Sequence, residues 1–282
     1  MPLPDQFDLE EFLDRVLAED LGKGGDVTSN ATIAADARFA AQMNARQAMV
    51  VAGLDLAAAF FRKLDADARI DLSAADGDAV EARSPLMRID GNARAMLAAE
   101  RSALNTLQHL SGIATLTREY VDAIAGTGTK LLDTRKTIPG LRVLEKYASR
   151  MGGAENHRMR LDDGVLIKDN HVAVCGGVAE AVRRAKAANT GLQVQVEVDR
   201  IDQIEPALAA GADRLLLDNM PPQVLREAVA VVKGRVPLEA SGGVTLETIR
   251  EIAATGVNYI SAGRITQSAP AVDIGLDYSI AV

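Results

Sequence analysis

Polar side chains capable of chemistry follow six short apolar runs in the second half of this 282-residue sequence. Apolar runs without alternation are typical of parallel strands that are buried on both faces. Because the carboxyl ends of parallel strands meet at one edge of an α/β barrel, we expect these polar residues to converge on a single site. The six runs end in DTRKT, KDNH, EVD, LDN, EASGG and SAGR.

The segment from Lys130 to His171 concentrates positive charge. After Lys130 it carries eight Lys or Arg against six Asp or Glu, and it holds two of the three histidines. Arginine recognises carboxylates through a bidentate fork, so several such groups at strand ends and in a glycine-rich loop predict a site for a small polyanion. Ion pairing with Asp133, Asp162 or Asp169 is the alternative. The candidate cations are Arg135, Lys136, His157, Arg158 and Lys168.

Three further basic residues follow a different pattern. Arg142, Lys146 and Arg150 are spaced four apart in the string LRVLEKYASRM. Residues at this spacing lie on one face of a helix. We therefore predict that these three form a solvated stripe and do not bind a ligand.

Two carboxylates, Glu197 and Asp218, end consecutive predicted strands and should face the same edge as the cations. Such a pair could hold Mg²⁺ through one or two oxygens, stabilise a cationic transition state, or act as acid and base. Each could instead be a helix N-cap.

The strings ASGGV and SAGR place small residues before predicted helices. Backbone N–H groups at a helix start favour phosphate binding, which makes these strings candidates for a phosphate site. The alternative for Gly242 and Gly243 is a tight turn only.

Strands and helices alternate from about residue 113 onward, which indicates a βα repeat. About six units are present, and full closure needs eight, so we expect an open or incomplete TIM-like α/β barrel. A doubly wound sheet is the second interpretation, although no GxGxxG follows the first strand. Before this repeat, we predict a helix over residues 8–20, an antiparallel sheet over 37–91 interrupted by the helix LDLAAAFFRKL, and a long helical pattern from Asn92 that breaks at Gly112.

Composition excludes several classes of protein. Hydrophobic residues make up 48% and charged residues 25%, as in globular proteins, and the net charge of -8 argues against binding nucleic acid through a broad basic face. The single cysteine, Cys175, cannot form an internal disulfide. The N-terminal region is acidic and amphipathic, and no stretch is long and apolar enough to span a bilayer, so we expect a soluble cytoplasmic protein.

The strings DTRKTIPGLRVLEKYASRMGGAENHRMRLDDGVLIKDNH, ERSALNTLQHLSGIAT, VEVD, LLLDNM, LEASGGV and TQSAPAVDIGLD resemble the quinolinate phosphoribosyltransferase family. These enzymes are also called carboxylating nicotinate-nucleotide pyrophosphorylases, and they are pentosyl glycosyltransferases of NAD biosynthesis. The resemblance implies an N-terminal α/β sandwich over residues 1–112, an α/β barrel over 113–265, and a tail, 266–282, that packs back on the first domain.

The resemblance also implies a reaction and a set of site residues. Quinolinate and phosphoribosyl pyrophosphate would give nicotinate mononucleotide, pyrophosphate and CO₂, with Mg²⁺ held by Glu197 and Asp218. The implied catalytic residues are Lys136, Lys168, Glu197 and Asp218. The implied quinolinate-binding residues are Arg135, His157, Arg158 and Lys168, with Arg101 supplied by the partner subunit of a homodimer. The implied phosphoribosyl pyrophosphate-binding residues are Lys136, Thr137, Glu197, Asp218, Ser241, Gly242, Gly243 and Gly263.

Three positions depart from the pattern of the family, namely His109, Arg160 and Gln267. Two other functions remain as alternatives. Lys168 at a strand end could be the nucleophile of a Schiff-base lyase. A barrel that senses a pyridine dicarboxylate without turnover is the non-enzymatic alternative, against which the pair Glu197 and Asp218 argues.

Overall fold

The computed structural model describes residue 4 and residues 7–278, and these fall into two compact units. The first unit comprises the chain up to Leu116, the segment Val143–Gly152 and the C-terminal segment from Ala269. The second unit comprises Thr117–Arg142 and Gly153–Ser268. Among the described residues, no helix has both the length and the apolar character needed to cross a bilayer.

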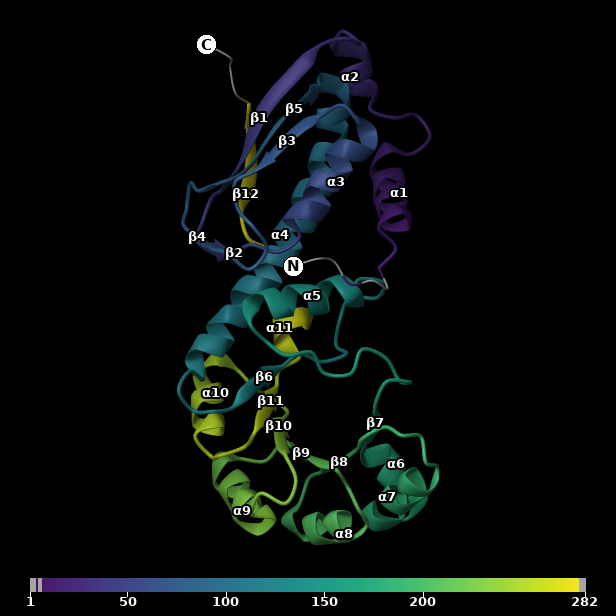
Figure 1. Ribbon diagram of the computed structural model, residues 1–282, viewed down its shortest axis with the longest axis vertical. Helices are drawn as coiled ribbons and strands as arrows, with labels where there is room; N and C mark the ends of the chain where they lie inside the picture. Colours follow the sequence, from purple (N-terminus) through teal and green to yellow (C-terminus); the bar gives the residue numbers. More distant parts are fainter. Residues whose placement is uncertain (1–3, 5–6, 279–282) are drawn as a thin grey trace. The chain divides into compact units, whose positions relative to one another are not determined.

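An antiparallel four-stranded sheet with helices beside it forms the first unit (Figure 1). Its strand order is β12-β1-β5-β3, and a separate two-stranded sheet pairs β2 with β4. Alternate residues in the second half of strand β1 are buried, as expected for a strand with one face on the core. The elements are α1 (Leu9–Leu21), α2 (Val27–Thr32), β1 (Arg38–Ala45), β2 (Met49–Val50), α3 (Leu54–Leu64), β3 (Arg69–Leu72), β4 (Ala79–Val80), β5 (Pro85–Asn92), α5 (Arg142–Gly152) and β12 (Ile274–Tyr278).

Aromatic and aliphatic side chains join α1 and α3 in the core of this unit. Asp8 caps α1 by accepting a hydrogen bond from the Glu11 backbone N–H, which satisfies one of the free donors at the helix start. The Phe12 ring of α1 lies 6.0 Å from the Phe60 ring of α3, and both residues are buried. The two helices predicted from the sequence here are therefore present and pack on each other.

Helix α4 (Ala93–Ala123) runs for 31 residues without interruption, so the predicted break at Gly112 is wrong. A Cβ atom at Gly112 would lie 2.1 Å from the carbonyl oxygen of Pro270. Glycine is required here because the chain that leads to β12 passes directly against the helix. The residue marks a close approach of two backbones and not a helix end.

Replacing Gly112 with alanine is expected to destabilise the protein. Alanine normally stabilises a helix interior, but here its methyl group would overpack against Pro270 and lower the free energy of unfolding by about 1–3 kcal/mol. Urea unfolding measures this. Gly24→Ala is the control, since its Cβ would meet only Val27 Cγ1 at 3.9 Å. A Gly112→Ala protein as stable as the wild type would contradict the close approach.

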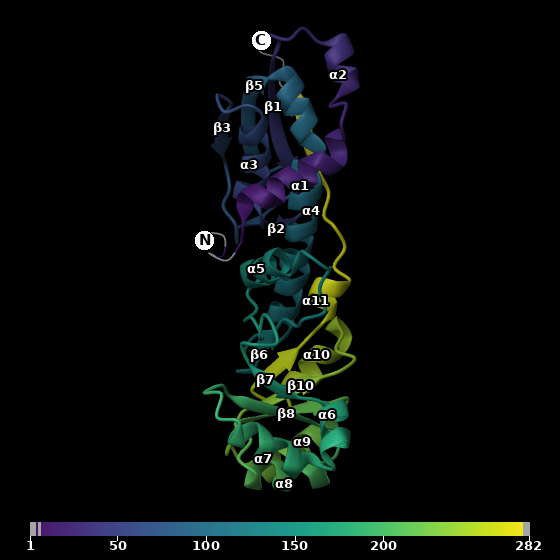
Figure 2. The ribbon, with the colours of Figure 1, turned by 90° about the vertical axis from the view of Figure 1, so that its right-hand side faces the viewer.

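The second unit is built on six parallel strands in the order β6-β11-β10-β9-β8-β7. Within the described residues the two edge strands, β6 and β7, do not pair, so the predicted open barrel is confirmed. The strands follow an arc with α7 to α10 on its outer side, and Figure 2 shows α7 to α9 together on one side of the strands (Figures 1 and 2). The strands are β6 (Lys130–Leu132), β7 (Val165–Ile167), β8 (Val194–Val198), β9 (Arg214–Asp218), β10 (Leu238–Ser241) and β11 (Tyr259–Ser261). The helices are α6 (Asp169–Cys175), α7 (Val178–Ala187), the 3₁₀ turn Ile201–Gln203, α8 (Ile204–Ala209), α9 (Pro222–Val232), α10 (Leu246–Ala253) and α11 (Arg264–Gln267).

Helix α5 differs from its prediction. Lys146 is fully buried, as is its neighbour Glu145, so the predicted solvated stripe is wrong at this position. The buried carboxylate has a partner in the same unit, because His109 Nε2 lies 2.9 Å from Glu145 Oε1. Most of α5, Val143–Gly152, belongs to the first unit, although the sequence placed this stretch inside the barrel domain. Of the three residues of the predicted stripe, only Arg150 is exposed, and Arg142 is half-buried.

Candidate active site

A cavity of about 600 Å³ lies at the carboxyl ends of the parallel strands. Side chains two residues apart along a strand point to the same face, and several such pairs line the cavity. The pairs are Leu166 and Lys168, Leu216 and Asp218, and Glu239 and Ser241.

Most of the residues singled out from the sequence line this cavity. Thr137 does not line it, and its hydroxyl accepts a hydrogen bond from Arg142 Nε at 3.1 Å. Arg101 belongs to the first unit and is exposed on α4. Those that line the cavity are Arg135, Lys136, His157, Arg158, Lys168, Glu197, Asp218, Ser241, Gly242, Gly243 and Gly263.

Two arginines stand together in the wall of the cavity. Burial lowers the pKa of Arg158, and the positive charge of Arg135 lowers it further, so the two guanidinium groups repel each other. Arg158 Nη1 donates to the carbonyl oxygen of Gly164 at 3.0 Å, while Arg135 Nε is buried without a hydrogen-bond partner among the described residues. Like charges held this close favour an anionic ligand between them.

The alternative of internal ion pairs does not account for the arginines and lysines of the cavity. Asp162 pairs with Arg160 at 2.9 Å, and Asp133 accepts the backbone N–H of His157 at 2.8 Å. Among the described residues, no ion pair joins a carboxylate to Arg135, Lys136, Arg158 or Lys168.

The carboxylates Glu197 and Asp218 face the same cavity from β8 and β9. Burial raises the pKa of Glu197, the negative charge of Asp218 raises it further, and Lys168 partly offsets the two. Asn219 Nδ2 donates to Asp218 Oδ2 at 2.6 Å and so orients that carboxylate. Within the described residues, no group of three or more His, Cys, Asp or Glu could hold a metal ion. Two carboxylates fit Mg²⁺ only where ligand oxygens complete its coordination, as phosphates commonly do.

Replacing Glu197 with glutamine is expected to stabilise the protein in metal-free buffer. The raised pKa means that the folded state disfavours the ionised carboxylate, so removing the charge should add a few tenths of a kcal/mol at pH 7, because solvent screens this half-buried group. Below the unfolded value of 4.5 the carboxylate is protonated in both states and the gain should vanish. Urea unfolding of both proteins at pH 7 and pH 4 measures this, and a gain that grows on acidification would contradict it.

Glycines bring the backbone close to side chains in the wall of the cavity. Gly242 has φ +95°, and a Cβ there would lie 2.1 Å from Asn219 Oδ1. A Cβ at Gly263 would lie 2.7 Å from Lys136 Cδ. These positions leave backbone, not side chains, facing the cavity, which suits a phosphate.

The sequence assigned no individual role to two polar residues of the cavity, Glu239 and Asn219, although both stand in the strand-end strings EASGG and LDN. Glu239 is fully buried in β10, two residues before Ser241. Alternation along the strand could have revealed it, because a residue two positions before a cavity residue shares its face. Asn219 has φ +53°, a left-handed conformation that asparagine tolerates better than most residues.

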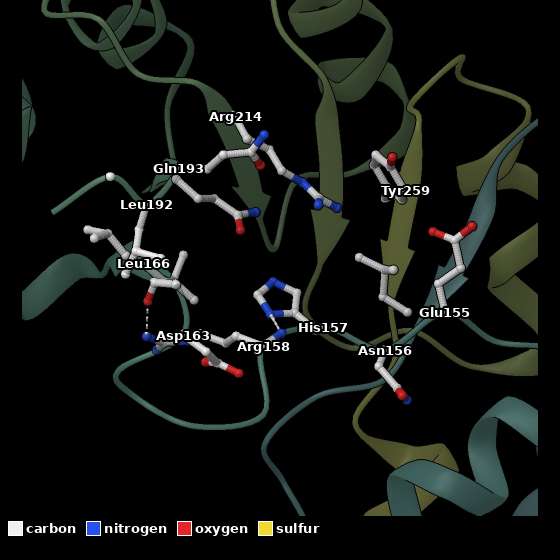
Figure 3. Close-up of a pocket in the computed structure, with 15 residues that line it drawn as sticks. Glu155, Asn156, His157, Arg158, Asp163, Leu166, Leu192, Gln193, Arg214 and Tyr259 are labelled. Atoms are coloured by element: carbon white, nitrogen blue, oxygen red, sulfur yellow. Dashed lines mark hydrogen bonds between the residues drawn. The ribbon is translucent and has the colours of Figure 1, made fainter. Parts of the chain in front are cut away.

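A second cavity of about 450 Å³ lies toward the amino ends of the strands. Figure 3 shows that the side chains of His157, Arg214 and Tyr259 line it. His157 and Arg158 line both cavities and therefore stand between them.

Comparisons with known proteins agree with this arrangement. The family models for quinolinate phosphoribosyl transferase match along most of the chain, the N-terminal domain over residues 26–111 and the C-terminal domain over residues 113–277. The probable nicotinate-nucleotide pyrophosphorylase (carboxylating) of Bacillus subtilis (strain 168) is 41% identical over 273 residues, which is 96% of this chain and 94% of that protein. The nicotinate-nucleotide pyrophosphorylase (carboxylating) of Mycobacterium leprae (strain TN) is 44% identical over 93% of this chain and 94% of its own length.

The solved structures agree as well. The nicotinate-nucleotide pyrophosphorylase from Francisella tularensis superimposes with a TM-score of 0.93 at 39% identity, covering 99% of this chain and 100% of that one. With both family domains matched in order and relatives above 40% identity over nearly the whole length, the chain belongs to the quinolinate phosphoribosyl transferase family.

Proposed function

We propose that this chain transfers the phosphoribosyl group of phosphoribosyl pyrophosphate to quinolinate, with loss of CO₂, to give nicotinate mononucleotide and pyrophosphate. By this proposal it is a nicotinate-nucleotide pyrophosphorylase (carboxylating) of NAD biosynthesis, the activity for which its relatives are named. The observation that carries the proposal is the pair of arginines, Arg135 and Arg158, which share one wall of a cavity with no carboxylate paired to them among the described residues. The two negative charges of a dicarboxylate would balance the positive charges of these arginines.

In this proposal the cations bind and orient quinolinate. Arg135, Arg158 and Lys168 contact its two carboxylates, and His157 completes this side of the site. Lys136 lies between the two substrates, since its side chain reaches Gly263 at the phosphate end. Holding the pyridine nitrogen against the ribose carbon converts a two-substrate encounter into a local attack, which is worth several kcal/mol of the barrier.

The carboxylates act on the ribose. As the pyridine nitrogen bonds to C1 and the C1–oxygen bond to pyrophosphate breaks, positive charge develops on the sugar. Glu197 and Asp218 face the cavity where that charge develops, and fixed negative groups stabilise it. The alkylated ring is a pyridinium, which accepts the electron pair left when the adjacent carboxylate departs as CO₂, and a proton then takes the vacated position.

Phosphate binding falls to the backbone of the glycine-containing turns. Ser241, Gly242, Gly243 and Gly263 line the cavity, and Thr137 adjoins it through Lys136. Glu197 and Asp218 would also hold Mg²⁺, together with oxygens of phosphoribosyl pyrophosphate, and the ion would neutralise the leaving pyrophosphate.

The activity can be tested directly with the purified protein. Quinolinate, phosphoribosyl pyrophosphate and Mg²⁺ should yield CO₂, pyrophosphate and nicotinate mononucleotide, and chelation of the metal should stop the reaction. Nicotinate, which lacks one carboxylate, should react poorly. Preference for nicotinate would contradict the assignment of the cations to two carboxylates. Trapping by borohydride with a carbonyl substrate would instead favour a lyase at Lys168.

The proposal includes a homodimer in which Arg101 reaches the site of the other subunit. Arg101→Ala and Asp218→Asn should each be inactive alone. Refolding them together should restore about a quarter of wild-type activity, because half of the subunit pairs are mixed and each mixed pair holds one site without either substitution. Arg160→Met mixed with Asp218→Asn is the control for recovery during refolding. No recovery with Arg101→Ala would place Arg101 in its own subunit's site or outside any site.

A further inference from the structure

Glu239 of β10 is a fully buried carboxylate that lines the proposed substrate cavity. Three side chains approach one of its oxygens, Oε2. Gln195 Nε2 donates to it at 2.8 Å, Arg214 Nη2 lies 2.9 Å away and His157 Nε2 lies 3.4 Å away. The proposed reaction uses no proton or bond at Glu239, so a different reason is needed for a buried charge at this position.

The surroundings keep Glu239 ionised. Burial alone would raise its pKa, but the proximity of His157, the charge of Arg214 and the hydrogen bond from Gln195 together outweigh burial and lower the pKa. Arg214 is itself fixed, since its guanidinium carbon lies 3.9 Å from the centre of the Tyr259 ring. The negative charge therefore sits at one defined place below the cavity.

The ring of His157 is held on both sides by the protein. Its Nδ1 accepts the backbone N–H of Arg158 at 2.8 Å, as the dashed line in Figure 3 shows. A nitrogen that accepts such a bond carries no hydrogen, so the hydrogen of the neutral ring is on Nε2, which faces Glu239. The imidazolium form would lose the hydrogen bond from Arg158.

This arrangement fixes Arg158. Its backbone N–H is bound to the His157 ring, and the backbone N–H of His157 is bound to Asp133 Oδ1 at 2.8 Å. The Arg158 guanidinium then reaches Gly164 and the cavity wall. A shift of the His157 ring would move the backbone from which this guanidinium projects.

We propose that Glu239 is a positioning residue for the dicarboxylate: it holds neutral His157 by Nε2, and His157 in turn fixes the backbone of Arg158. The part that concerns the dicarboxylate rests on the proposed function, whereas the state of the His157 ring does not. Within the site, His157 supplies geometry, and the positive charge comes from Arg135, Arg158 and Lys168.

The state of the ring can be measured in the wild-type protein by ¹⁵N nuclear magnetic resonance. The chain has three histidines, and a His157→Gln sample assigns the signals of His157. At pH 7.5 we expect a protonated Nε2 and an unprotonated Nδ1. A proton on Nδ1, in either the other tautomer or the imidazolium, would overturn the proposal without any variant having to fold or any substrate having to bind.

The link to substrate is tested with Glu239→Gln, which keeps the shape and removes the charge. Calorimetry should show quinolinate binding about tenfold weaker, because a displaced guanidinium loses its alignment, while phosphoribosyl pyrophosphate binds as before. The matched control is Glu155→Gln, two residues before His157 but exposed and paired with Lys130, which should change neither affinity. Equal losses for both substrates would indicate general damage, and wild-type affinity for quinolinate would refute positioning.

Glutamine at 239 leaves Arg214 without its counter-ion, so this variant risks misfolding. The double variant Glu239→Gln/Arg214→Met removes both buried charges and should show the same selective loss. If the wild-type protein bound no quinolinate at all, the proposed function would fail, and the His157 spectrum would still decide whether Glu239 holds the ring.

Discussion

Replacing Arg158 with methionine is expected to lower kcat/KM for quinolinate by about 10³-fold, because methionine keeps the stem of the side chain and removes the guanidinium. A bidentate pair with a carboxylate contributes about 1.5–3 kcal/mol for each charge-assisted bond, and two such bonds convert to roughly this factor. Steady-state kinetics with each substrate varied in turn gives the measurement. The loss should fall mainly on KM for quinolinate, since the guanidinium binds the carboxylate before and during reaction.

The control for this change is close in the sequence. Arg160 is exposed and pairs with Asp162 at 2.9 Å, so Arg160→Met removes the same charge outside the cavity and should stay within about twofold of the wild type. Comparable losses in both variants would mean that overall charge, and not the cavity wall, attracts the substrate. Equal increases in KM for quinolinate and phosphoribosyl pyrophosphate would remove Arg158 from the dicarboxylate subsite.

The residues that end the parallel strands were predictable because two simple rules apply to them. An apolar run without alternation indicates a strand buried on both faces, and the polar residue that follows must lie at the carboxyl edge. Lys168 and Asp218 follow these rules, whereas Glu197 stands one residue before the end of the alternating strand β8; the structure brings all three to one cavity. Their chemical roles remain part of the proposed function.

Glu239 shows where those rules fail. It stands at the start of the strand-end string EASGG, and a glutamate there predicts an exposed side chain at the edge of the sheet. Its burial depends on Gln195, Arg214 and His157, which come from two other strands and a loop far away in the sequence. The strand order that brings β8, β9 and β10 together cannot be predicted from any one of these segments alone.

Helix α5 shows the same limit for a helix. The spacing of its basic residues correctly indicates a helix, but spacing cannot reveal what covers each face. Lys146 is fully buried although the spacing predicts a solvated face, and its neighbour Glu145 contacts His109 of α4. Gly112 is similar, since the need for glycine comes from Pro270, 158 positions later, and not from its own helix.

Replacing Asp218 with asparagine is expected to lower kcat by about 10²–10³-fold, the usual loss when one fixed group that stabilises transition-state charge is removed. The geometry should survive, because the side-chain oxygen of an asparagine at 218 can still accept the hydrogen bond that Asn219 Nδ2 donates at 2.6 Å. The loss then reports the charge. Quinolinate affinity, measured by calorimetry in the absence of phosphoribosyl pyrophosphate, should not fall, since the dicarboxylate contacts the cations at the other side of the cavity.

Asp199→Asn provides the matched control for Asp218→Asn. Asp199 directly follows β8, is exposed and does not line the cavity, so its loss of charge should leave kcat within about twofold of the wild type. If Asp218→Asn kept its kcat but needed far more Mg²⁺, the carboxylate would serve the metal and not the ribose. If it instead bound quinolinate many times more weakly, Asp218 would act on the acceptor, because only an effect confined to kcat fits a group that acts on charge developing at C1.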